Sequence, residues 1–234
     1  MEQILKAARL EKAELSEEEL DLINQQTLRP LGAEEVFSFR LAACDNQVDR
    51  DFERFTDSTL EEMAARFVGC PVLRDHNWSA EAQTARVYAA GVEPGEGEGV
   101  RRLVLRCYMV RTAQTTPAIT AIEGGILREC SVGLAVERAL CSICGADQRR
   151  TLCQHHPGRE YDGQVCHMDL DGVADTYEVS LVAVPAQPAA GVIKSKRYGG
   201  QEPPPDHEPP GKPGANSQDW RDKALLELEY NRFR

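Results

Sequence analysis

The sequence predicts an α+β domain with a barrel-like sheet, and three observations favour this class. Several short segments rich in aromatic and β-branched residues alternate with two or three segments of helical pattern. Turns rich in glycine and polar residues separate these segments. From about residue 194 the composition changes to a stretch rich in proline and glycine, which cannot form a core. At 234 residues the chain can hold one substantial core with appendages, or two small domains.

The N-terminal third is expected to pass from helix to strand to polar loop. Ser16 and Glu19 have the spacing of a helix capping box, and Pro30 is expected to end that helix. Residues 36–41 are rich in aromatic and branched side chains and predict a strand. Residues 45–55 are dense in carboxylates but lack the regular ligand spacing and turn glycine of a calcium loop. A solvated loop is therefore the prediction for that segment.

The remaining elements follow from caps and from hydrophobic pattern. Thr56 or Ser58 can cap a second helix that runs to about Phe67. Pro117 follows two threonines at the start of a third helix, which should end at Gly124. Further strands, the first of them running into a polar turn, are expected at residues 71–78, 85–92, 101–110, 128–137 and 176–185.

Four segments result from this interpretation. Residues 1–30 form an N-terminal helical segment, and residues 31–195 form the main domain, with a cysteine-rich insert at 139–168. Residues 196–218 are a Pro/Gly-rich linker, and residues 219–234 are a C-terminal helix or a disordered tail.

The net charge of −11 argues against nucleic acid and against an anionic membrane as a partner, since both need clustered Lys and Arg. The first six residues carry charge where a secretory signal would be apolar. No apolar run approaches the roughly 20 residues of a membrane span. A soluble, intracellular protein is expected.

The eight cysteines fall into two groups. Four are scattered singly among apolar residues and are expected to be buried thiols: Cys44, Cys70, Cys107 and Cys130. The other four crowd between residues 141 and 166, which is the pattern of a metal site.

The insert predicts a structural zinc site. Cys141 and Cys144 form a CxxC turn, which presents two sulfurs to one ion, and Cys153 supplies a third. The fourth ligand is His155 or Cys166, which the sequence leaves open. A structural zinc contributes on the order of 10 kcal/mol to folding, enough to order an insert without a hydrophobic core. A redox function for the CxxC turn is disfavoured because no thioredoxin-like context surrounds it.

The strand at 128–137 has one apolar face and one small face. Alternation places Val132, Leu134 and Val136 on the first, and Ser131, Gly133 and Ala135 on the second. A flat face with a hydroxyl at one end would let another backbone approach, as a peptide-cutting enzyme needs. Cys130 points to the face opposite Ser131, so only one of the two can meet a catalytic base.

Three sequence blocks together resemble the prohead maturation proteases of tailed phages of the HK97 type, in a subgroup that carries a zinc knuckle. The blocks are an apolar strand ending in His76, a Ser-Val-Gly strand at Ser131, and the segment Glu178-Val-Ser-Leu-Val-Ala-Val-Pro-Ala. The last block is the most specific, and the resemblance covers about residues 30–195. It implies a serine endopeptidase with a herpesvirus-maturase-like β-barrel and flanking helices.

The resemblance also implies roles and partners. Ser131 would be the nucleophile, His76 the general base, and Glu178 the third member, with Asp175 as a nearby alternative. Such enzymes act in the host cytoplasm inside the assembling prohead. They cut scaffold, or a scaffold segment of the major capsid protein, and often themselves, and a homo-oligomer is compatible with that setting.

Other interpretations of the sequence stay open. A cysteine protease that uses Cys130 is one alternative to Ser131 as nucleophile. A catalytically silent capsid assembly or scaffolding protein with the same fold is a second function class. A zinc-dependent binding module is a third.

Overall fold

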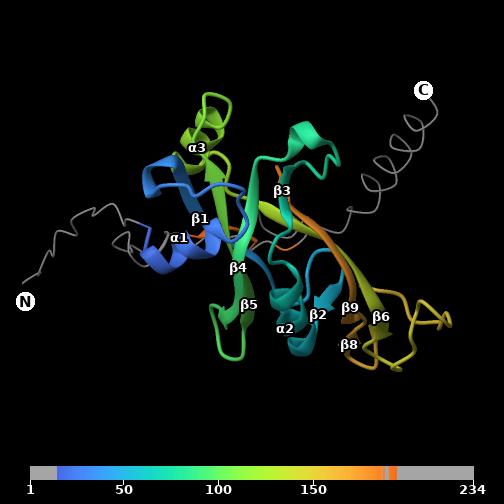
Figure 1. Cartoon of the computed structure of the whole chain (residues 1–234). Coiled ribbons are helices and arrows are strands. Elements are labelled where there is room, and N and C mark those ends of the chain that lie inside the picture. Colours follow the sequence, from blue (N-terminus) through green and yellow to red (C-terminus); the bar gives the residue numbers. More distant parts are fainter. Residues whose placement is uncertain (1–14, 186, 188–189, 194–234) are drawn as a thin grey trace, which may run out of the picture. The chain divides into compact units, whose positions relative to one another are not determined.

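The computed structural model describes residues 15–185, 187 and 190–193 (Figure 1). Within them the fold is mixed α and β, with a mostly sheet core, which confirms the predicted α+β class. The α-helices are α1 (Glu17–Asn24), α2 (Asp57–Arg66) and α3 (Thr116–Glu123). The strands are β1 (Val36–Asp45), β2 (Glu53–Phe55), β3 (Pro71–Arg74), β4 (Ala85–Pro94), β5 (Arg101–Val110), β6 (Cys130–Cys141), β7 (Glu160–Tyr161), β8 (Gln164–Val165), β9 (Met168–Leu181) and β10 (Gly191–Ile193). The expected linker at 196–218 and the C-terminal segment at 219–234 lie outside the described residues, as do residues 1–14.

Eight of the strands form one sheet in the order β10-β1-β5-β4-β3-β9-β2, with β6 paired to the other edge of β9. The long β9 is antiparallel to β6 and parallel to both β3 and β2. Near its start, β6 approaches the far end of the sheet, because Glu129 bridges Gly191 and the Cys130 N–H donates to the Ala190 carbonyl at 3.5 Å. Beyond that point β6 and β1 are not paired within the described residues, and the sheet stays open. The predicted barrel closure is therefore not confirmed.

Helix α2 fixes the position of β9 from one side. Thr56, one of the two caps that the sequence allows, caps the helix by accepting from the Thr59 N–H at 3.3 Å. The Thr59 hydroxyl, fully buried, donates to the Leu170 carbonyl at 3.1 Å and accepts from the Gly172 N–H at 2.9 Å. Leu60 and Met63 of the helix are buried in the main core. The first part of β9 is thus held both by packing and by hydrogen bonds.

Several sequence-based boundaries need correction. Helix α1 has the predicted capping box at Ser16 but ends at Asn24, not at Pro30. The Asn24 side chain makes two hydrogen bonds to the backbone of Leu31, at 2.8 and 3.2 Å, and these turn the chain before the proline is reached. The expected polar loop at 45–55 contains β2, a short strand that pairs in parallel with β9 and is also held to it by an ion pair between Arg54 and Asp169.

The four singly placed cysteines are buried with one exception. Cys44, Cys107 and Cys130 are buried, whereas Cys70 is half-buried. None of the helices in the described part of the chain is long and apolar enough to cross a membrane.

Candidate functional site

His76 is presented by a tight turn at the end of β3. Asp75 and His76 both have positive φ, 54° and 52°, a backbone region that residues with a Cβ rarely adopt. Two hydrogen bonds to β9 hold the turn: the Asp75 N–H donates to the Leu181 carbonyl, and the His76 N–H donates to the Ser180 hydroxyl, both at 3.0 Å. Strained backbone of this kind persists where the surroundings over-determine it, and it gathers at functional sites. Here it turns the chain back over β9.

The imidazole of His76 meets a buried carboxylate. Nδ1 of His76 lies 2.7 Å from Oε1 of Glu178, a distance at which the ring N–H donates to the carboxylate. The Glu178 side chain is 2% exposed, whereas that of His76 is 42% exposed. A buried carboxylate is costly unless it is hydrogen-bonded, and both oxygens of Glu178 have a partner. The pair can thus fix one orientation and one tautomer of the ring. Nε2 of His76 is then available to accept a proton on the side where substrate would bind.

Ser180 supplies the second partner, and no sequence motif pointed to it. Its fully buried hydroxyl donates to Oε2 of Glu178 at 2.5 Å and accepts the His76 N–H described above. One side chain therefore holds both the carboxylate and the backbone of the histidine. Strand alternation could have indicated that Ser180 lies near Glu178, because residues 178 and 180 of one strand share a face.

Ser131 belongs to the same face of the sheet. In the antiparallel register of β6 and β9, Ser131 lies opposite Ser180 and Gly133 lies opposite Glu178. Directly opposed residues in such a pair share a face, with Cβ atoms about 4.5–5.5 Å apart. Ser131 and His76 therefore flank the same Ser180 side chain. The described hydrogen bonds do not include one between His76 and Ser131; such bonds often form only when substrate binds.

Gly133 has a specific steric function. A Cβ built on Gly133 would lie 2.2 Å from Oε1 of Glu178 and 3.0 Å from its Cδ. The absence of a side chain thus makes room for the carboxylate that contacts His76. The flat face expected to receive a substrate backbone is, at this position, already covered by Glu178.

The two alternative catalytic residues are placed differently. Cys130 is fully buried, its Sγ contacts the Ala42 carbonyl at 3.4 Å, and burial raises the pKa of its thiol to about 12. A thiol of that pKa is a poor nucleophile near neutrality. Asp175 lies opposite Ala135 on an exposed part of β9, and its carboxylate accepts from the Thr176 N–H at 2.9 Å. Among these acids, the structure brings Glu178 to His76.

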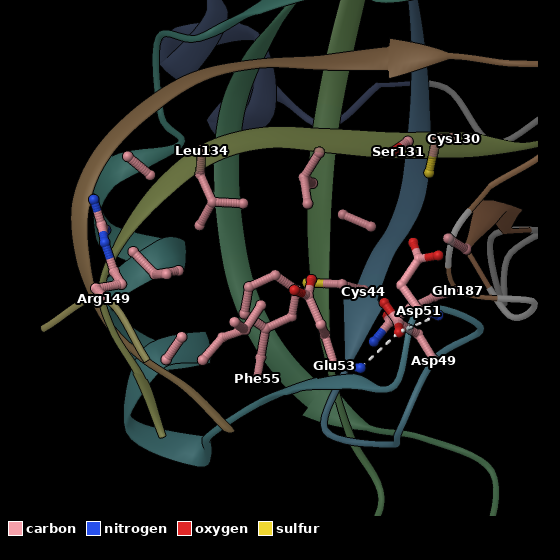
Figure 2. A pocket seen from close by; sticks show the side chains of 17 residues that line it. Cys44, Asp49, Asp51, Glu53, Phe55, Cys130, Ser131, Leu134, Arg149 and Gln187 are labelled. Carbon is pink, nitrogen blue, oxygen red and sulfur yellow. Dashed lines mark hydrogen bonds between the residues drawn. The ribbon is translucent and has the colours of Figure 1, made fainter. Parts of the chain in front are cut away.

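A cavity of about 450 Å³ lies along β6 where the sheet stays open (Figure 2). Its apolar wall includes Leu134, and Phe55 of β2 stands opposite. Ser131 and Cys130 are at one end of this stretch of β6, and Arg149 of the insert is at the other in Figure 2. The carboxylates that line the cavity are Asp49, Asp51 and Glu53. Partial burial, and then the charges of the two aspartates, raise the pKa of Glu53.

The insert brings together four ligand atoms from Cys141, Cys144, Cys153 and His155, all within 4.8 Å of one another. The turn after Cys141 is closed by the Gly145 N–H, which donates to the Cys141 carbonyl at 2.8 Å, with Gly145 at a φ of 73°. Three thiols and one imidazole are a usual donor set for tetrahedral structural zinc. The insert residues therefore fit a metal ion of this kind.

The remaining thiol, Cys166, is outside that group of four. Its Sγ lies 3.8 Å from Sγ of Cys141, it is fully buried, and burial raises its pKa to about 11. The backbone N–H of His155, by contrast, lowers the pKa of Cys153. Nδ1 of His155 is buried without a hydrogen-bond partner among the described residues, as expected for a nitrogen left for a metal. The geometry favours His155 over Cys166 as the fourth ligand.

Comparisons with protein-family models, with curated proteins and with solved structures found no match for this chain.

Proposed function

We propose that the chain is a serine endopeptidase, in which Ser131 is the nucleophile, His76 the general base, and Glu178 the acid that orients and stabilises the imidazole. The observation that carries the proposal is the buried Glu178 carboxylate 2.7 Å from Nδ1 of His76, on the sheet face that Ser131 shares. Nucleophile, base and orienting acid on one surface are the arrangement that activates a serine hydroxyl.

The reaction follows from these positions. As the Ser131 hydroxyl attacks the scissile carbonyl carbon, Nε2 of His76 takes its proton, and the resulting imidazolium is stabilised by the Glu178 carboxylate. His76 then gives the proton to the leaving amine as the C–N bond breaks. Water repeats the sequence on the acyl-enzyme and releases Ser131. A general base in such a position contributes about 10²–10⁴ in rate.

The physiological substrate class comes from the resemblance of the three sequence blocks. On that basis the enzyme processes the major capsid protein, or its scaffold segment, inside an assembling prohead of the phage, and also cleaves itself. A structural zinc ion in the insert would be held by Cys141, Cys144, Cys153 and His155 and would order residues that contribute little core.

Co-expression with the capsid protein tests the proposal. The unmodified chain is expected to yield a trimmed capsid protein, with the cut identified by mass spectrometry. Ser131→Ala should stop the trimming while the chain still folds, and Cys130→Ala should leave trimming intact. Trimming that persists in Ser131→Ala would refute the nucleophile. A chain that never cuts would favour the catalytically silent scaffolding protein instead.

A further inference from the structure

Two aromatic side chains form an exposed pair next to the candidate site. Trp78 is 69% exposed and Tyr177 is 38% exposed, and their ring centroids are 5.3 Å apart at an interplanar angle of 52°. Large aromatic rings usually contribute most when buried, in a core or against a partner. An exposed aromatic pair of this kind is therefore typical of a surface that binds a ligand or a partner.

The pair is connected directly to the candidate catalytic residues. Trp78 follows His76 by two positions, just after the turn, and Tyr177 immediately precedes Glu178 on β9. A substrate group resting on these rings would be close to the general base and its acid. The aromatic pair thus lies within two positions of His76 and next to Glu178 along the chain.

A strand irregularity gives Tyr177 this position. Gly133 pairs with Glu178, but the next residue of β6, Leu134, pairs with Thr176, so Tyr177 is an extra residue on β9. An extra residue of this kind forms a β-bulge, which commonly re-aims a side chain beside an active site. The bulge allows Tyr177 to reach Trp78 while Glu178 stays buried against Gly133.

The neighbouring strand has only small side chains on this face. From β6 the residues Ser131, Gly133 and Ala135 take positions opposite Ser180, Glu178 and Asp175, and none has a side chain larger than a hydroxymethyl group. The Glu178 carboxylate fills the space over Gly133, so the close approach of a bound polypeptide is beside Ser131, while a larger side chain rests on the rings.

We propose that Trp78 and Tyr177 form a specificity subsite, which binds a large apolar or aromatic side chain of the polypeptide substrate within a few residues of the cleaved bond. This inference rests on the proposed endopeptidase function. The tilted rings offer apolar faces that an aliphatic or aromatic side chain covers, with water excluded from both partners.

Cleavage of a proteome-derived peptide library by the purified full-length chain tests this assignment. The expected result is enrichment of Leu, Met, Phe or Tyr at one fixed position relative to the cut, and loss of that enrichment in Trp78→Ala. On a single preferred peptide, Trp78→Ala and Tyr177→Ala should each raise KM about tenfold or more while kcat changes little, as expected for lost binding contacts. Leu152→Ala, which removes an 84% exposed apolar side chain in the insert, is the matched control and should change neither.

Different results refute the endopeptidase function and the aromatic subsite. If no peptide is cut by the unmodified chain, the endopeptidase function is refuted and the subsite with it. If peptides are cut but the preferred position is Lys, Arg or a small residue, or Trp78→Ala keeps the apolar preference, the subsite alone is refuted.

Direct binding gives a second readout. The chain has two tryptophans, so Trp220→Phe in a Ser131→Ala background leaves Trp78 as the single tryptophan. Titration with the preferred peptide should change the fluorescence of Trp78. The dissociation constant from this titration should equal the one that calorimetry gives. Binding without any change in fluorescence would place the peptide elsewhere and contradict the subsite.

Discussion

Replacement of Gly133 by alanine tests the geometry of the site through a single methyl group. The new Cβ would lie 2.2 Å from Oε1 of Glu178, 3.0 Å from Cδ and 3.3 Å from Cγ. To restore a normal contact, Oε1 has to retreat by roughly 1 Å, and a displacement of that size in a catalytic group can cost about 10²-fold in rate. The movement breaks the 2.7 Å contact with His76, and loss of tautomer control can increase the cost to about 10⁴-fold.

The same change should cost only modest stability. Overpacking of a close-packed site destabilises by about 1–3 kcal/mol. Part of this is offset, because alanine in a strand is favoured over glycine by roughly 0.5–1 kcal/mol. The prediction is therefore a folded protein with kcat lowered about 10²–10⁴-fold. Peptide cleavage gives the rate, and urea denaturation gives the free energy of unfolding.

Gly91 provides the matched control. It lies on β4, its φ is not positive, and a Cβ built there meets nothing within 4 Å. Gly91→Ala should leave kcat unchanged and the free energy of unfolding equal or slightly higher. If Gly133→Ala cleaves as fast as Gly91→Ala, the Glu178–His76 contact does not support catalysis and the reasoning is refuted.

Two further changes address the buried serine and the metal centre. Ser180→Ala leaves one oxygen of the buried Glu178 without a partner, so the free energy of unfolding should fall by about 1–3 kcal/mol and kcat by tenfold or more; unchanged values in denaturation and cleavage assays would contradict a positioning role. Purified protein should carry about one equivalent of zinc by elemental analysis, as expected for one set of four ligands. Cys144→Ser should lose this zinc, whereas Cys166→Ser should retain it. If Cys166→Ser loses the zinc and Cys144→Ser retains it, Cys166 is a ligand and Cys144 is not.

Local patterns predicted the local elements well. The bounds of β5 and the Thr56 cap of α2 follow from side-chain periodicity and capping chemistry, which operate within a few residues. The short strands β2 and β10 were missed because each pairs with a strand distant in sequence, which local pattern does not show. The early start of β9 at Met168 was missed for the same reason, since its first residues pair with β2 and with the end of β6.

The candidate site could be predicted in its residue types but not in its contacts. His76 and Glu178 are 102 positions apart, and no periodicity connects them; only the order of the sequence blocks suggested that they meet. The small size of Gly133 was noted, but its physical reason, the carboxylate packed over it, depends on the register of β6 against β9. Ser180 was missed because a serine within an apolar strand block gives no signal of what its hydroxyl contacts.

Labelling with a fluorophosphonate probe tests the convergence of His76, Ser131 and Glu178 most directly, because it requires no knowledge of the substrate. An activated serine oxygen displaces fluoride and forms a stable phosphonyl ester, which peptide mass spectrometry locates. The account predicts one adduct per chain on Ser131, with labelling slowed about 10²–10⁴-fold in His76→Ala. An adduct on another residue, or an unchanged labelling rate in His76→Ala, would contradict it.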